Sequence, residues 1–245
     1  MKKVIIIGAS SGLGARIATD YARAGWSVGI AARRTDLLRQ IAALYPDNII
    51  DRAIDVSAPD AAGRFCNLIE DLDGMDLLIY CAGTGYQDPG LDPETVMTTL
   101  HTNVDGFARI VTAAFRYFRD TASRTPGQIA VITSIAGTKG MGIAAAYSAS
   151  KRFESIYIDA LEQLAYSTKV NVRFTDIRPG FIRTGLLDPD KDYPMIMSID
   201  YAAPRIERAI ARHRRRAVID WRWRVITALW RMIPQRLWKH IVLTR

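Results

Sequence analysis

The sequence predicts an α/β protein with a doubly wound parallel sheet of about seven strands and helices on both faces. Short apolar, β-branched runs alternate along the chain with longer segments of helical periodicity, which is typical of strand–helix–strand units. The first run, Val4-Ile5-Ile6-Ile7, is apolar at every position, as expected for a strand buried on both faces. At 245 residues, the chain is long enough for one domain with a sizeable core.

The local patterns place each element. Strands are predicted at residues 3–8, 27–32, 49–54, 76–81, 128–134, 170–176 and 216–220. Helices are predicted at residues 12–24, 36–44, 58–71, 93–120, 147–167 and 201–212. Residues 183–200 lack strong periodicity, and such a long loop often covers a binding site; a plain surface connection is the alternative. We predict a single domain over residues 1–220 and a separate tail over residues 221–245.

A glycine-rich turn connects the first strand to the first helix. Its sequence is Gly8-Ala9-Ser10-Ser11-Gly12-Leu13-Gly14, and glycine permits a tight turn and a close approach of backbone to ligand. The first N–H groups of the following helix have no helical partners, and the helix dipole favours an anion there. A strand, a glycine turn and a helix in this order predict a pyrophosphate-binding site.

Tyr147 and Lys151 lie four residues apart in a predicted helix. Residues at this spacing share one helix face, with about 5–6 Å between their Cβ atoms. A free phenol is a poor acid or base at neutral pH, and a nearby ammonium stabilises its ionised form. The pair could therefore give a proton to a carbonyl oxygen or take one from an alcohol. Taken alone, an ordinary exposed helix face explains the same spacing.

Together these motifs resemble the short-chain dehydrogenase/reductase family, in its compact single-domain branch, over roughly residues 1–220. Further matches follow in the family's order: Asp55-Val56, Cys81-Ala82-Gly83, Asn103, Ser134, and Pro179-Gly180 with Thr184. One departure is Tyr80-Cys81, where the family often has asparagines. The resemblance implies a Rossmann-type fold and a nucleotide-binding oxidoreductase.

The resemblance also implies a catalytic set of Asn103, Ser134, Tyr147 and Lys151. Tyr147 is expected to act as general acid in reduction and general base in oxidation, with Lys151 supporting its ionised form and binding the nicotinamide ribose. Ser134 is expected to donate a hydrogen bond to the carbonyl oxygen and stabilise the charge that develops there. Asn103 is expected to hold a water molecule in a proton relay through Lys151.

The chain is expected to bind NADP rather than NAD. An NAD-selective site needs an acidic side chain at the end of the second strand, where this chain has Ala32 followed by Arg33-Arg34. Guanidinium groups match the charge and geometry of a phosphate, although two solvated arginines are the plainer interpretation. The complete expected cofactor-binding set is Gly8, Ser10, Ser11, Gly12, Leu13, Gly14, Arg33, Arg34, Asp55, Val56, Ala82, Gly83, Asn103, Tyr147, Lys151, Pro179, Gly180, Ile182 and Thr184.

Basic charge is concentrated at the C-terminus. The net charge is +8, and residues 205–245 carry twelve Lys and Arg against Glu207 and Asp220. On a helical wheel, the apolar side chains of the tail gather on one side: Trp223, Ile226, Leu229, Trp230, Ile233, Leu237 and Ile241. An apolar face opposite a cationic face suits an interfacial helix on anionic lipid. Packing on the body or on a partner subunit is the alternative, and no nucleic acid is expected because no reading motif accompanies the basic patch.

The leading functional hypothesis is an NADPH-dependent reductase, reversible as an alcohol dehydrogenase, of a ketone or aldehyde on an apolar substrate. The tail favours a lipid-like carbonyl of the 3-ketosphinganine or steroid type. A nucleotide-sugar epimerase or dehydratase is a weaker alternative, because its relatives have a different glycine spacing and a longer substrate domain. A non-enzymatic cofactor-sensing or lipid-binding scaffold on the same fold is the remaining alternative.

Composition sets further expectations. Three scattered histidines and two cysteines show no metal-ligand spacing, so no metal is expected. No stretch approaches the roughly 18 apolar residues of a membrane span. We therefore expect a cytoplasmic protein that touches the inner face of a membrane through residues 221–245, and a homo-oligomer, either a dimer or a tetramer.

Overall fold

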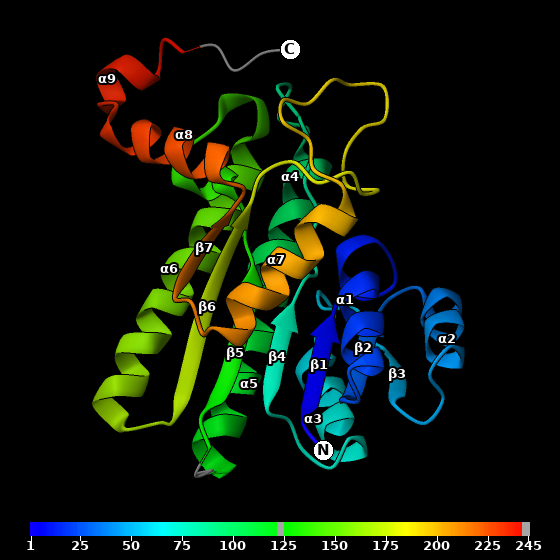
Figure 1. The fold of residues 1–245 in the computed structure, drawn as a ribbon. Coiled ribbons are helices and arrows are strands. Elements are labelled where there is room, and N and C mark those ends of the chain that lie inside the picture. Colours follow the sequence, from blue (N-terminus) through cyan, green and yellow to red (C-terminus); the bar gives the residue numbers. More distant parts are fainter. Residues whose placement is uncertain (122–124, 242–245) are drawn as a thin grey trace.

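A seven-stranded sheet with the order β3-β2-β1-β4-β5-β6-β7 forms the centre of this computed structural model (Figure 1). Every neighbouring pair of strands is parallel, which confirms the predicted fold class. Residues 1–121 and 125–241 are described; residues 122–124 of the predicted domain and 242–245 of the predicted tail lie outside the described residues. The strands are β1 (Lys3–Ile7), β2 (Ser27–Ala32), β3 (Ile49–Ala53), β4 (Leu77–Tyr80), β5 (Gly127–Ile132), β6 (Val172–Pro179) and β7 (Arg216–Ile219).

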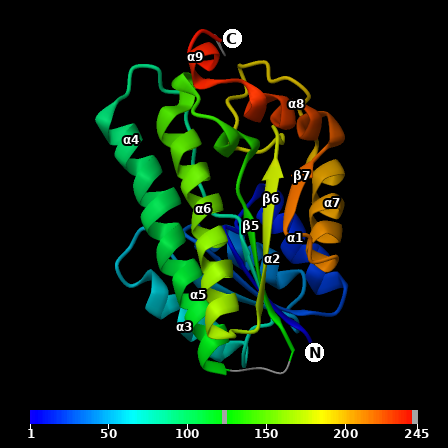
Figure 2. The same cartoon turned by 90° about the vertical axis from the view of Figure 1, so that its left-hand side faces the viewer.

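Helices cover both faces of the sheet (Figure 2). Val4 and Ile6 face a core packed by α1 (Gly12–Arg23), α2 (Thr35–Ala43) and α7 (Ile199–Ala211). Ile5 and Ile7 face a second core packed by α3 (Ala61–Asp71), α5 (Phe107–Thr121) and α6 (Ala145–Thr168). Because side chains alternate along a strand, one apolar run supplies both cores, and burying each such side chain contributes about 1.5–3 kcal/mol.

The predicted helix at 93–120 is divided. It consists of α4 (Pro93–Leu100), a π-helical turn at His101–Gly106, and α5. Asp92 caps the start of α4 by accepting a hydrogen bond of 2.8 Å from the Thr95 N–H. A π-turn widens the helix locally and is frequent at functional sites, and this one carries Asn103.

The sheet also differs from the prediction at β6, which ends at Pro179 rather than at residue 176. The strand therefore extends up to Gly180, and residues 181–198 continue at the carboxyl edge of the sheet (Figure 1). This edge is where ligands bind in open α/β sheets.

The predicted tail forms α8 (Trp221–Met232) and α9 (Gln235–Trp238), which lie at the same end of the molecule as residues 181–198 (Figure 1). Asp220 starts α8 by accepting a hydrogen bond of 2.9 Å from the Arg222 N–H. Pro234 separates the two helices, as expected from its missing N–H and fixed φ.

The expected single apolar face of the tail is divided between two environments. Trp223 and Trp238 are buried against the body of the protein. The Trp238 indole N–H donates 2.7 Å to the carbonyl of Gly140, and the Lys139 ammonium donates 2.7 Å to the carbonyl of Ile233. A second set of apolar side chains faces outward and is exposed: Trp221, Val225, Leu229, Met232, Leu237 and Ile241.

Candidate active site

The glycine turn between β1 and α1 has no room for side chains at two of its positions. A Cβ at Gly8, where φ is +88°, would lie 2.5 Å from the Ala82 nitrogen, and a Cβ at Gly14 would overlap the Gly8 carbonyl oxygen. Ser11 precedes α1 without capping it through its side chain, and no acidic residue lies in the first helical turn. The first N–H groups of α1 therefore remain available to an anion.

Arg34 lies across this turn. Its guanidinium donates to the Ser10 hydroxyl at 2.9 and 3.2 Å and to the Ser11 hydroxyl at 2.5 Å. Ala32 ends β2, so the strand presents no carboxylate at this point, and Arg33 is exposed. A phosphate at this position would meet the Arg34 charge and two hydroxyl groups.

Tyr147 and Lys151 lie on α6, as predicted. The Lys151 nitrogen is 5.9 Å from the centroid of the Tyr147 ring, and Lys151 is buried while Tyr147 is partly accessible. A side chain at Gly85 would overlap the Tyr147 ring, so the backbone after β4 packs directly on this ring. The phenol is thus held against the segment that follows the fourth strand.

Asn103 is fully buried and joins three segments of the site. Its amide nitrogen donates 2.7 Å to the Thr84 carbonyl and 3.0 Å to the Ser150 hydroxyl, and its oxygen accepts 2.9 Å from the Thr84 N–H. A Cβ at Gly83 would lie 3.2 Å from the Lys151 nitrogen and 3.3 Å from the Asn103 oxygen. Asn103, Gly83 and Lys151 therefore converge at the carboxyl end of β4.

Ser134 follows β5 and is buried. Its hydroxyl oxygen accepts a hydrogen bond of 3.1 Å from the Ala136 N–H. The next turn packs on α6 beside Lys151, because a Cβ at Gly137 would lie 2.8 Å from the Lys151 carbonyl oxygen. The two segments carrying Ser134 and Tyr147 are therefore neighbours.

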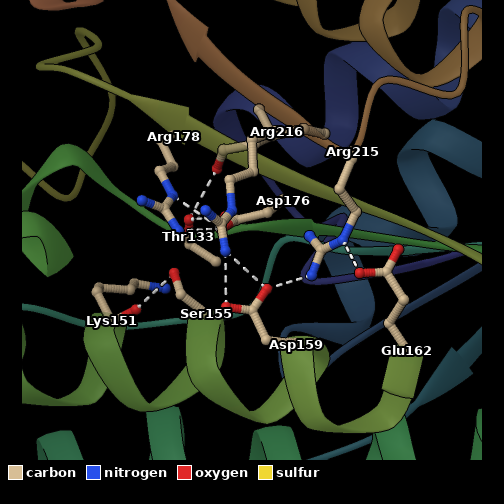
Figure 3. A network of polar contacts seen from close by, with 10 residues as sticks. Thr133, Lys151, Ser155, Asp159, Glu162, Asp176, Arg178, Arg215 and Arg216 are labelled. Carbon is tan, nitrogen blue, oxygen red and sulfur yellow. Dashed lines mark hydrogen bonds and ion pairs between the residues drawn. The ribbon is translucent and has the colours of Figure 1, made fainter. Parts of the chain in front are cut away.

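Behind Ser134, a buried polar network supports the ends of β5 and β6. Figure 3 shows Thr133 and Arg178 directed at Asp176. The Thr133 hydroxyl donates 2.6 Å to one carboxylate oxygen, and the Arg178 guanidinium donates 2.7 Å to the other. Asp176 is fully buried and Arg178 nearly so, and a charge can be buried in this way only when it is paired.

The sequence did not single out Glu154, which is fully buried one helical turn after Lys151. The Lys151 ammonium donates 2.8 and 3.0 Å to its two carboxylate oxygens. Burial, opposed by the Lys151 charge, raises the pKa of Glu154 to about 7. Burial is the largest single influence and favours a neutral Lys151. The charges of Glu154 and Tyr147, together with the hydrogen bonds to Glu154, outweigh it and raise the pKa of Lys151 above its ordinary value.

The remaining predicted residues lie around the same edge. Asp55 accepts hydrogen bonds from the Ser57 N–H (3.0 Å) and hydroxyl (2.7 Å), which stabilise the turn after β3. Val56 packs on Gly106 in the π-turn, where a Cβ would lie 2.6 Å from it.

The segment after Gly180 reaches back to the glycine turn. A Cβ at Gly12 would lie 3.3 Å from the Thr184 methyl carbon, so the two segments nearly touch. Ile182 directs its side chain into the core, and its backbone pairs with Met197. The loop also touches the segment after β4, because Lys191 donates 3.1 Å to the Gln87 side chain.

The sequence profile of the short chain dehydrogenases matches residues 2–193. The chain belongs to the short-chain dehydrogenase family. An uncharacterised oxidoreductase of Myxococcus xanthus is 30% identical over 243 residues, which span 96% of this chain and 94% of that relative. The family membership predicted from the motifs is thereby confirmed, and the protein is a short-chain oxidoreductase.

Solved structures of this fold have been determined with either nicotinamide cofactor. A short chain dehydrogenase from Burkholderia cenocepacia in complex with NADP superposes with a TM-score of 0.83 at 19% identity, over 100% of both chains. A 3-ketoacyl-(acyl-carrier-protein) reductase from Brucella melitensis complexed with NADH gives a TM-score of 0.79 at 21% identity, over 89% of this chain and 96% of that one. These likenesses show the shared fold.

Two other features of the described residues bear on the site. Within residues 1–121 and 125–241, no group of three or more His, Cys, Asp or Glu side chains could hold a metal ion. Over the same ranges, no helix is both long and apolar enough to cross a membrane.

Proposed function

We propose that this protein is an NADPH-dependent reductase of a ketone or aldehyde, and that it also works in reverse as an alcohol dehydrogenase. The observation that carries the proposal is the convergence of Asn103, Lys151 and the Tyr147 ring beside the turn that follows Ser134. This end of the sheet also holds the glycine turn. The Tyr147 ring and the glycine turn thus lie at one edge of the sheet, as this function requires.

The residues of the site divide the work of carbonyl reduction. Tyr147 gives its hydroxyl proton to the carbonyl oxygen, and the Ser134 hydroxyl donates a second hydrogen bond to that oxygen as its negative charge develops. Lys151 stabilises the tyrosine anion left behind. Asn103 holds a water molecule in the relay through Lys151 that returns a proton to Tyr147. A bound nicotinamide supplies the hydride.

The residues of the glycine turn fit the cofactor. Gly8 and Gly14, where no side chain would fit, let β1, the turn and α1 pack closely together. The backbone N–H groups at the start of α1 are proposed to bind the pyrophosphate. NADP is proposed rather than NAD because Ala32 offers no carboxylate to a ribose hydroxyl, whereas Arg34 and two serine hydroxyls form a donor cluster. Guanidinium groups bind phosphate with favourable charge and geometry.

The substrate is proposed to be an apolar, lipid-like carbonyl compound that reaches the site from an anionic membrane surface. The exposed apolar stripe of α8, formed by Trp221, Val225, Leu229 and Met232, lies at the same end of the molecule as the site (Figure 1). Residues 221–241 contain five Lys and Arg and no Asp or Glu. An apolar stripe among cationic side chains suits the headgroup region of an anionic bilayer.

The organisation of the chain follows from the same proposal. Residues 1–220 form the catalytic domain, and residues 221–245 form a segment that contacts the membrane peripherally from the cytoplasmic side. We also propose a homodimer or homotetramer, since α6 exposes Ile156, Leu164 and Tyr166. No nucleic acid is expected.

The test is a substrate screen that follows the NADPH absorbance of the purified protein with steroid ketones, ketosphingoid bases and small ketones. Turnover of an apolar ketone that is absent in Tyr147→Phe supports the proposal. Binding of NADPH without reduction of any of these carbonyls, at any pH from 5 to 9, contradicts the reductase activity and favours a cofactor-sensing scaffold. Turnover of small polar ketones alone contradicts the lipid-like substrate.

A further inference from the structure

Three acceptor atoms within the protein lie within hydrogen-bond distance of the buried Lys151 nitrogen. The nitrogen lies 2.8 and 3.0 Å from the carboxylate oxygens of Glu154 and 3.3 Å from the carbonyl oxygen of Ile132. A lysine ammonium has three donors and no acceptor, so these contacts use all of them. A Lys151 that also binds the ribose of a cofactor must therefore release one of these partners.

Glu154 holds two of the three donors and is the partner whose charge can change. Its side chain has no exposed area, and that of Lys151 has 5%. Burial comes first among the causes that raise its pKa to about 7, and the nearby Asp176 charge adds to it, while Lys151 opposes it. The Ile132 carbonyl, in contrast, accepts a hydrogen bond at any pH.

The groups that face Glu154 come from three elements. Lys151 precedes it on α6, Tyr80 comes from the end of β4, and Asp176 comes from β6, where its charge is paired with Arg178. Cys81, the residue after Tyr80, interacts with Lys151. Burial, and then the Glu154 charge, raise the pKa of Tyr80, and burial raises the pKa of Cys81 to about 12. Both groups therefore stay neutral when Glu154 gains or loses its proton near neutral pH.

We propose that Glu154 is the positioning residue of Lys151, and that uptake of one proton from solvent by its carboxyl group frees an ammonium N–H for the cofactor. The ionised carboxylate accepts two hydrogen bonds from Lys151. After protonation, one of the two oxygens carries a hydrogen and becomes a donor, so it accepts a hydrogen bond from the ammonium less well. The inference rests on the proposed nicotinamide cofactor, and it makes binding of that cofactor depend on the protonation of Glu154.

The test measures proton uptake on cofactor binding, without any substrate. Binding favours the protonated Glu154, so its pKa rises in the complex and protons are taken up just above pH 7. Calorimetry of NADP⁺ binding at pH 7.5, in two buffers with different ionisation enthalpies, should give roughly 0.3–0.8 proton more for the wild type than for Glu154→Gln. From pH 6 to 8.5, the wild-type affinity should fall about tenfold more than that of the variant. The phosphates of the cofactor contribute equally to both proteins.

Two further variants separate positioning from structure. Glu154→Asp keeps a titrating carboxyl group and should restore proton uptake. Glu162→Gln makes the same chemical change on the same helix, at an exposed residue that pairs with Arg215, and should behave as the wild type.

Equal proton uptake and parallel affinity curves in the wild type and Glu154→Gln, with both proteins binding NADP⁺, would overturn the role of Glu154 and leave the proposed function intact. Failure of the wild type to bind NADP⁺ or NAD⁺ would overturn the proposed function itself. If Glu154→Gln does not fold, the affinity curve of Glu154→Asp decides. If the affinity curve of Glu154→Asp is displaced along the pH axis from that of the wild type by at least about half a pH unit, the role of Glu154 is supported. An affinity curve that matches the wild type rejects it.

Discussion

The indole of Trp223 occupies the space that a side chain at position 180 would need, because a Cβ built on Gly180 would overlap the indole ring. Trp223 belongs to α8, and Gly180 directly follows β6. The same indole lies 5.6 Å from the Phe181 ring, which in turn lies 4.9 Å from the ring of Tyr193. The segment proposed to meet the membrane is thus packed on a segment expected to bind the cofactor.

This contact predicts that Trp223→Ala destabilises the whole domain. Removing a buried tryptophan typically costs about 3–5 kcal/mol, because it loses buried area and leaves a cavity. Trp221→Ala, two residues away at an exposed position, should cost less than about 0.5 kcal/mol. Urea unfolding of both variants gives the comparison. Similar losses in the two variants would show that Trp223 does not anchor α8.

Arg34 is predicted to select the cofactor. Arg34→Ala should weaken NADPH binding at least about tenfold, or 1.4 kcal/mol, and leave NADH binding nearly unchanged, because only NADPH carries the additional phosphate. Arg39→Ala, at an exposed position on α2, is the matched control and should alter neither affinity. Calorimetry with both cofactors measures the effect. A wild type that binds the two cofactors equally well contradicts the assignment.

Tyr147 is predicted to be the proton donor. Tyr147→Phe should retain the fold and cofactor affinity, since only a hydroxyl is lost, while turnover falls at least about 100-fold. Tyr157→Phe, on the same helix and hydrogen-bonded to Thr112 at 2.6 Å, serves as the control for loss of a hydroxyl. Turnover of the ketone found in the substrate screen is the measurement. Near-normal rates in Tyr147→Phe would assign the acid elsewhere.

The outward face of α8 is predicted to bind anionic vesicles. The double variant Val225→Glu, Leu229→Glu should reduce binding to phosphatidylserine-containing vesicles at least about tenfold, because it removes apolar area and adds negative charge. Salt should weaken the wild-type interaction, since screening reduces the contribution of each basic group, about 1 kcal/mol. Leu44→Glu, another exposed leucine, should bind as the wild type. Vesicle sedimentation that shows no wild-type binding at low salt rejects the membrane contact.

Glu207 is predicted to make stability depend on pH. Burial, and then the Asp20 charge, raise its pKa from 4.5 to about 7. A raised pKa in the folded state means that the favourable contribution of the protonated carboxyl group is present below pH 4.5 and is lost as the pH rises through about 7. Glu207→Gln cannot ionise, so its stability relative to the wild type should increase between pH 5 and pH 8. Urea unfolding at both pH values measures this difference, and a constant difference contradicts the prediction.

Most of the fold could be predicted from sequence because its signals are local. The apolar run at Val4–Ile7, the glycine turn and the spacing of Tyr147 and Lys151 each depend on a few neighbouring residues. Boundaries were less predictable: the π-turn at His101–Gly106 and the extension of β6 to Pro179 leave no distinct sequence pattern. The roles of the predicted site residues stay predictions, although the structure places them along one edge.

Two features could be identified only from the tertiary structure. A glutamate three residues after a lysine usually forms a solvated pair on a helix surface, and only the sheet behind α6 makes the Lys151–Glu154 pair a buried one. The helical wheel of the tail predicted a single apolar face, as if the helix packed against one surface only. The body of the protein takes up Trp223 and Trp238 and leaves Leu229 and Met232 outside, because a short helix lying on a surface has two environments.

The N-terminus lies at the amino end of β1, at the end of the molecule opposite to α8 and α9 (Figure 1). Met1 is 77% exposed, so a linker attached there would leave the other end of the molecule unobstructed. A protein immobilised through residue 1 on a sensor chip would present α8 and the loop at residues 181–198 to flowing solution. Vesicles and soluble nucleotides could then be applied to the same oriented layer, together or in turn.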